Sequence, residues 1–194
     1  MSSLTLLAFG TVAALTLTAC GAAEDNGGEH NAAATSTATA RTTFRLGDES
    51  PLQESSMQSS KGATYTVTPA KVVTGTEADM ERSGLEQDKE DGPQVPVYVW
   101  STFTHKSGKP MALGDMDDNL VVRTNAGHRT RALIVIMGRA KWPDCPPFDS
   151  ATVMAAGQSA SICTAFLIPQ GQQPAAVEFT QGFYRQPLAW PVKD

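Results

Sequence analysis

The fold of this chain is decided by the stretch Val95-Pro96-Val97-Tyr98-Val99-Trp100-Ser101-Thr102-Phe103-Thr104. Successive side chains of a β-strand point to opposite faces, so an alternating pattern assigns each residue to a face. One face carries the apolar residues 95, 97, 99 and 103, and the other face carries Tyr98 and Trp100. This is the strongest strand signal in the sequence.

Further strands are predicted on both sides of this one. Tyr65 and Val67 alternate with threonines, and a phase shift after Pro69 is typical of an edge strand that contains a bulge. Alternating apolar and polar residues predict a strand at 44–48, and apolar stretches predict the others, at residues 120–122, 132–137, 162–168 and 175–179. About seven short strands in about 150 residues favour an all-β fold, an immunoglobulin-like antiparallel β-sandwich.

Residues 76–91 are the exception to the strand pattern. Thr76 followed by Glu77 and Asp79 is typical of a helix start, and Gly92-Pro93 is typical of a stop. We expect a short helix or an ordered loop that spans two strands.

The strand residues also resemble a known family. The stretches that carry the resemblance are Tyr65-Thr66-Val67, Pro96-Val97-Tyr98-Val99 leading to His105-Lys106-Ser107-Gly108, and Gly157, Phe166-Leu167-Ile168-Pro169 and Val177-Glu178-Phe179. Over residues 44–192 the chain resembles the DUF4352-like, immunoglobulin-like lipoprotein domains of Gram-positive bacteria, notably actinobacteria. The resemblance implies a β-sandwich attached outside the membrane, and it implies no catalytic residues.

The first 19 residues are typical of a bacterial signal peptide. Residues 4–18 carry no charge, and the run is shorter than the about 20 apolar residues of a spanning helix. It ends in Leu17-Thr18-Ala19-Cys20, which resembles a lipobox. Because Met1-Ser2-Ser3 lacks the usual basic residue, we expect the true start to lie upstream. The alternative is a transmembrane anchor in which Cys20 is an ordinary small residue.

Lipidation of Cys20 determines where the protein would work. A diacylglyceryl group of the palmitate type supplies two acyl chains, whereas a single chain anchors only marginally. Residues 20–43 follow as a flexible linker, because alanines are their only apolar residues. We therefore expect a domain at 44–194, with Ala63 as a possible later boundary, held by Cys20 on the outer face of the cytoplasmic membrane.

The charge pattern argues against nucleic acid as a partner. The 194-residue chain has 18% charged residues and a net charge of −5. It contains no run of Lys or Arg that could neutralise a row of phosphates.

The three cysteines predict one disulfide. If Cys20 is acylated, Cys145 and Cys163 remain as a pair in an oxidising compartment. A bridge between them would stabilise the domain by about 3 kcal/mol. The alternative is metal or redox chemistry, but the sequence has no C-x-x-C and no His at ligand spacing from either Cys.

Two groups of residues are weak candidates for a metal site. Asp115, Asp117 and Asp118 could bind Ca²⁺, but the EF-hand pattern fails, so we interpret them as a solvated turn between strands. Copper could be bound by His105 and the thioethers of Met111 and Met116, although methionines more often fill the core.

No motif for catalysis or cofactor binding stands out. The sequence lacks G-x-S-x-G and H-E-x-x-H, and the disulfide would use the remaining thiols. His105 and His128 could each act as a base, but a His at a strand end or turn is usually polar surface. We expect no catalytic residues and no cofactor.

The loop that carries Trp142 and Phe148 is the best candidate for a binding surface. Prolines around Cys145 stiffen this loop, and a rigid aromatic loop loses little entropy when it binds. The alternative is that both rings close over the core. The sequence thus favours a non-catalytic module that binds a protein, an envelope component or a small ligand; the runner-up is a lipoprotein that binds Cu or Ca.

Overall fold

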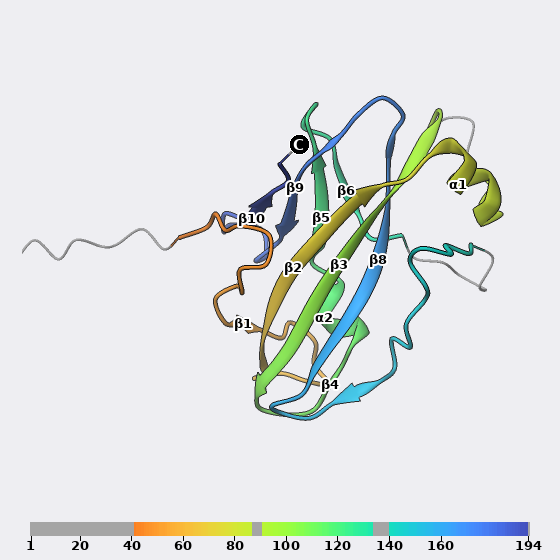
Figure 1. Ribbon diagram of the computed structural model, residues 1–194. Coiled ribbons are helices and arrows are strands. Elements are labelled where there is room, and N and C mark those ends of the chain that lie inside the picture. The colour runs from red at the N-terminus through yellow and green to blue at the C-terminus, as the bar shows by residue number, and fades with distance from the viewer. Residues whose placement is uncertain (1–40, 87–90, 134–139, 194) are drawn as a thin grey trace, which may run out of the picture. The chain divides into compact units, whose positions relative to one another are not determined.

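The structure, a computed structural model, describes residues 41–86, 91–133 and 140–193. All of these residues belong to one compact unit, residues 39–194 (Figure 1). The predicted signal peptide, residues 1–19, and residues 20–40 of the predicted linker lie outside the described residues. In the part that is described, no helix is long and apolar enough to cross a membrane.

The unit is built from two antiparallel sheets. The first has the strand order β1 (Gln53–Glu54), β2 (Thr64–Thr74), β3 (Gln94–Ser107) and β8 (Ser159–Pro169). The second has the order β10 (Leu188–Pro191), β9 (Pro174–Phe179), β5 (Leu120–Thr124) and β6 (Arg129–Arg131). A small third sheet pairs β4 (Met111–Ala112) with β7 (Val153–Met154). The predicted immunoglobulin-like, all-β sandwich is therefore confirmed.

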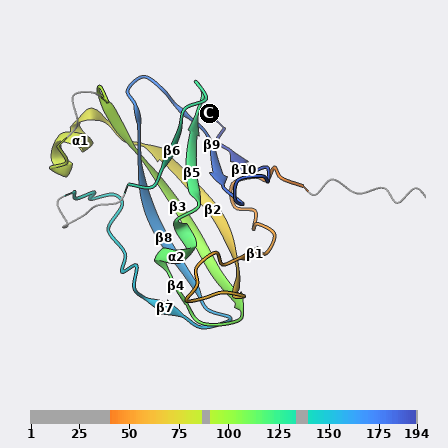
Figure 2. The same ribbon diagram turned by 180° about the vertical axis from the view of Figure 1, so that it is seen from behind.

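The two faces of β3 are both buried, as its sequence pattern predicts. Val97, Val99 and Phe103 are fully buried in the large core between the two sheets. Tyr98 belongs to a second cluster on the opposite face, and Trp100 packs against that cluster. Figures 1 and 2 show the β2-β3-β8 sheet and the β5-β9 sheet from opposite sides.

The predicted bulge in β2 is present. The register of β2 against β3 shifts between Pro69 and Lys71. Along the other edge of β2, β1 pairs only with Thr64 and Tyr65. Farther along, the N–H of Ser50 donates to the carbonyl of Val67 at 2.9 Å, so loop residues partly cover this edge.

The segment 44–48 does not form the strand that its alternation predicts. Its only ladder contact lies one residue earlier, where Thr43 pairs with Ala189 of β10 in parallel orientation. The chain then turns, because the Asp48 carboxylate accepts the Arg45 N–H at 2.9 Å. Phe44 is buried, and the centroid of its ring lies 5.5 Å from that of Trp190. This apolar residue therefore anchors the segment to the core at one point and does not belong to a strand.

The predicted helix is present but shorter than the window in the sequence. Helix α1 (Glu77–Ser83) begins after Thr76, whose side chain accepts the Asp79 N–H in a capping box. It ends at Gly84, which has a φ of 71°, a left-handed conformation that favours glycine. Gly84 therefore stops the helix before the predicted stop at Gly92-Pro93.

The apolar run 132–137 lies mostly outside the described residues. Ala132 pairs with Phe166 of β8, and the Leu133 N–H donates to the Ala165 carbonyl at 2.8 Å. Residues 134–139 are not described, so the strand predicted there stays a prediction.

Candidate functional site

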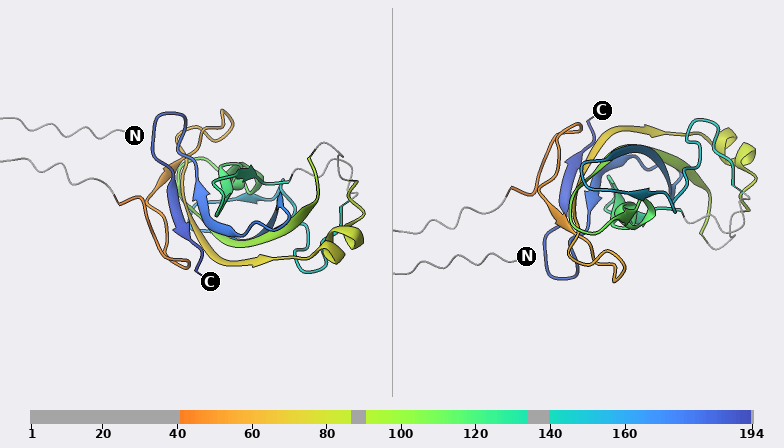
Figure 3. Two further views of the ribbon diagram at one scale, coloured as in Figure 1. Left: turned by 90° about the horizontal axis from the view of Figure 1, so that it is seen from above. Right: turned by 90° about the horizontal axis from the view of Figure 1, so that it is seen from below.

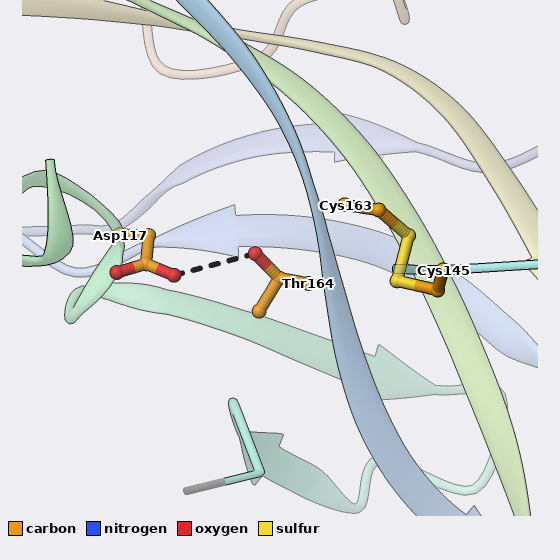
Figure 4. Close-up of a disulfide and its surroundings, with 4 residues drawn as sticks. All are labelled: Asp117, Cys145, Cys163 and Thr164. Carbon is orange, nitrogen blue, oxygen red and sulfur yellow. Dashed lines mark hydrogen bonds between the residues drawn. A yellow bond between two sulfur atoms is a disulfide. The ribbon is translucent and has the colours of Figure 1, made fainter. Parts of the chain in front are cut away.

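The predicted cysteine pair forms a disulfide on the outer face of the first sheet. Cys145 and Cys163 are joined, with their Cα atoms 5.3 Å apart. Cys163 lies on β8 opposite Trp100 of β3 (Figure 4). Both thiols are consumed by this bond, so neither can serve as a nucleophile or a metal ligand. Cys20, the predicted lipidation residue, lies outside the described residues.

The disulfide holds the aromatic loop against the sheet. Trp142 is only 6% exposed, and its ring meets Tyr98 edge to face at 5.8 Å. Phe148 is partly buried and packs against the main core. Both rings therefore close over the sheet, which was the alternative to a binding surface. The Trp142 indole N–H is buried and has no acceptor among the described residues.

The acidic residues 115–118 lie between β4 and β5, as predicted, but only two of the three carboxylates face solvent: Asp118 is exposed, Asp115 is half-buried and Asp117 is buried. They lie in and after α2 (Gly114–Asp117), whose single turn places Met116 in the main core and leaves the Asp117 side chain 8% exposed. The Thr164 hydroxyl of β8 donates to the Asp117 carboxylate at 3.3 Å (Figure 4). Asp117 is thus buried because its helical turn packs against the sheet.

Burial changes the acidity of Asp117. Desolvation, with a smaller effect from the negative charge of Asp118, raises the pKa of Asp117 to about 6, and the hydrogen bond from Thr164 opposes this rise. The protonated and ionised forms of this carboxyl are therefore both populated around pH 6. Such a group can exchange a proton, yet its described partner is a hydroxyl that holds it in place.

The candidate metal ligands are not brought together. In residues 41–86, 91–133 and 140–193, no three His, Cys, Asp or Glu side chains lie close enough to hold a metal ion. Met111 and Met116 are fully buried in the main hydrophobic core. They fill the interior, as methionines usually do.

His105 is a structural residue rather than a base at a strand end. It is fully buried at the end of β3. Its Nδ1 lies 3.1 Å from the Met154 carbonyl oxygen and its Nε2 lies 2.9 Å from the Ser107 carbonyl oxygen. Both ring nitrogens thus face backbone carbonyl oxygens inside the protein, so neither is aimed at a substrate or a copper ion. His128, by contrast, is exposed in the turn before β6.

An ion-pair cluster on the second sheet was missed by the sequence reasoning. Glu178 of β9 is 5% exposed and forms ion pairs with Arg123 at 2.7 Å and Arg129 at 2.8 Å. Glu178 is far in the sequence from the two arginines, but the three residues lie on the adjacent strands β9, β5 and β6. The signal available in the sequence was a single acidic residue in an apolar strand. The cluster ties three strands together through one buried carboxylate that two guanidinium groups share.

A shallow groove of about 300 Å³ lies beside α1. Its walls come from α1, from the start of β3 and from the turn after β8, through Glu77, Met80, Glu81, Leu85, Pro93, Gln94 and Gln170. The lining includes the carboxylates of Glu77 and Glu81 beside apolar side chains, which suits a weakly held polar ligand. It contains none of the catalytic, metal or binding candidates that the sequence predicts.

Among the described residues, the most exposed aromatic side chains were not singled out by the sequence reasoning either. Phe183 and Tyr184 lie between β9 and β10 and are 93% and 95% exposed. The signal in the sequence is a glycine, Gly182, followed by two aromatics and Arg185. Because neither ring contributes to the core, these two residues replace Trp142 and Phe148 as the candidate recognition surface.

Comparison with known proteins supports the fold. No known family matches the chain, and no curated protein is similar to it. The solved structure of MPT63, a secreted protein from Mycobacterium tuberculosis, superposes with a TM-score of 0.51 at 15% sequence identity. The match covers 77% of this chain and 96% of that chain. At this identity the likeness shows a shared fold, and the DUF4352-like family stays a prediction.

Proposed function

We propose that this chain is the precursor of an exported lipoprotein, anchored through Cys20 on the outer face of the cytoplasmic membrane. Its β-sandwich is a non-catalytic module that binds a protein, an envelope component or a small ligand. The observation that most supports export is the disulfide between Cys145 and Cys163. Disulfides persist in oxidising compartments and are rare in the cytosol.

Two further observations support export and anchoring. The superposed protein MPT63 is a secreted protein. The stretch Leu17-Thr18-Ala19-Cys20 at the end of an uncharged apolar run supports lipidation of the first cysteine. Lipidation of Cys20 also accounts for the odd number of cysteines, because the other two are paired.

The roles of the reactive side chains support a binding function rather than catalysis. The two thiols are joined, His105 is held by two carbonyl oxygens, and Asp117 is held by Thr164. General acid–base or nucleophilic chemistry needs such groups aimed at a reacting atom. Here they stabilise the sandwich, which leaves the exposed surface for recognition.

Metabolic labelling with a fatty acid tests the anchor. The wild-type chain should incorporate the label and fractionate with membranes, and Cys20→Ser should lose both properties. Cys145→Ser is the matched control, because it removes a cysteine that is not acylated and should keep the label. Label that persists in Cys20→Ser refutes the lipoprotein assignment. Crosslinking of the lipidated chain in cells then tests the binding function, which predicts a partner captured only when the anchor is intact.

A further inference from the structure

The loop between β9 and β10, residues 180–187, presents an aromatic pair to solvent. The rings of Phe183 and Tyr184 meet edge to face, with centroids 5.1 Å apart. Each is more than nine-tenths exposed, although burial of rings is what a single domain usually favours. Two adjacent exposed rings outside the core form a small apolar patch, which is a candidate contact surface.

The loop is a built element rather than a loose end. The Gln181 side-chain amide donates to the Gln186 carbonyl at 3.2 Å and so closes the base of the loop. Gly182 has a φ of 82°, which lets the chain turn outward. On the far side, Leu188 and Trp190 are buried and fix β10 in the core. The rings therefore sit on a short, fastened projection.

The start of the domain lies at the same end of β10 as this loop. The Ala189 N–H donates to the Thr42 carbonyl at 2.8 Å, and the Phe44 N–H donates to the Ala189 carbonyl at 2.9 Å. Because this pairing is parallel, the chain before Thr42 approaches from the Leu188 end of β10. Figure 3 shows the start of the orange segment and the connection between β9 and β10 on the same side of the sandwich. The predicted linker thus joins the domain on the side that carries the aromatic pair.

We infer that this loop docks the sandwich onto the surface of the bilayer that holds the lipid anchor. The inference rests on the proposed lipidation of Cys20. Phe183 would enter the boundary of the acyl chains, and the Tyr184 hydroxyl would stay at the level of the headgroups, where amphipathic rings are favoured. Arg185, with no ion pair to a described residue, would contact lipid phosphates.

Charge and linker length favour a membrane over a protein partner. Residues 180–187 contain Arg185 and no acidic residue, so the loop suits an anionic lipid surface. About 20 residues separate Cys20 from the domain, and a coil of that length spans about 25 Å. An anchor at that range keeps the loop at a high effective concentration near the bilayer. Two rings alone bind a membrane weakly, but the shared anchor makes this weak contact sufficient.

Quenching of a tryptophan placed in the loop tests the inference. Full-length lipidated Phe183→Trp is reconstituted into vesicles of phosphatidylglycerol and phosphatidylcholine, part of the latter brominated on its acyl chains. Wild type supplies the background from the other tryptophans. The matched control is Val153→Trp on β7, which is 63% exposed and lies at another end of the sandwich (Figure 2). Neither substitution touches the core, so both variants should fold.

We expect the brominated lipid to quench most of the extra tryptophan fluorescence of Phe183→Trp over wild type. The extra fluorescence of Val153→Trp should not be quenched. Flotation of the vesicles reports the anchor separately. Flotation without quenching at position 183 overturns the docking and leaves the lipoprotein assignment standing. A photo-crosslinker at position 183 that captures a protein in that case assigns the loop to a protein partner. Failure to float, with no lipid on Cys20, refutes the anchor and the docking together.

Discussion

Trp142→Ala should lower the free energy of unfolding by about 3 kcal/mol. The ring is buried against Tyr98 and shares a cluster with Met80 and the two disulfide cysteines. Truncation of a buried tryptophan to alanine typically costs about 3 to 5 kcal/mol, since it loses transfer energy and leaves a cavity. We expect the low end, because this cluster lies on the outer face of the sheet, where the loop can settle into part of the gap.

Calorimetry of the purified protein measures this loss. A change of 1 kcal/mol moves the Tm of a domain of about 150 residues by about 2 to 4 °C, so Trp142→Ala should lower the Tm by about 10 °C. Phe183→Ala is the matched control. It also removes an aromatic ring, but that ring is 93% exposed, and such surface changes stay within about 0.5 kcal/mol.

Trp142→Phe separates the packing of the ring from its polar group. Phenylalanine keeps a ring against Tyr98 and removes the indole N–H, which has no acceptor among the described residues. Removing a buried donor that has no partner is favourable, and this gain offsets part of the free energy lost with the smaller contact area. Trp142→Phe should therefore lower the free energy of unfolding by about 1 kcal/mol or less. A Tm for Trp142→Ala as high as that of Phe183→Ala would refute the packing and return the loop to the candidate binding surfaces.

Three further predictions concern other contacts of the sandwich. Cys145→Ser should lower the free energy of unfolding by about 3 kcal/mol, since the disulfide closes a separation of 18 residues; denaturant titration measures this, and an unchanged midpoint contradicts it. Folding raises the pKa of Asp117 from 3.8 to about 6. Between about pH 4 and pH 6 the unfolded chain has lost this proton while the folded protein still holds it, so the free energy of unfolding falls as the pH rises through this range. Asp117→Asn should flatten that slope in Tm measured against pH and should be more stable than wild type at pH 8 by up to about 3 kcal/mol; an unchanged slope excludes Asp117 as its source. Thr76→Ala should cost about 1 kcal/mol by removing the cap of α1, whereas Thr76→Ser should be nearly neutral in the same thermal melt.

The face pattern of the central strand could be read from the sequence because it depends on local geometry. Side chains alternate along β3 whatever its neighbours are, so residues 97 and 99 had to lie opposite Tyr98. The bulge after Pro69 and the cap at Thr76 are local in the same sense, since a ring-locked φ and a side-chain cap act within a few residues. These features were predicted and are present.

Features that depend on contacts between distant segments could not be read in this way. His105 looks like polar surface in the sequence, yet it is buried, and Met154 of the distant strand β7 places its carbonyl oxygen beside the ring. Asp117 follows a methionine that enters the core, and the turn of α2 takes the carboxylate inward with it. Residues 44–48 alternate like a strand, but β10 accepts only Thr43 beside Ala189.

Trp142 is buried, and so does not form the binding surface that the sequence favoured, because both faces of β3 are apolar. One face is covered by the second sheet, but the other face presents Tyr98 and Trp100, which would stand in water without a cover. The loop with Trp142 supplies that cover, and the disulfide to Cys163 keeps it in place. A ring used in this way cannot also be offered to a partner. We therefore place the proposed recognition surface where rings remain exposed, which in the part of the chain that the structure describes is the loop beside the predicted linker.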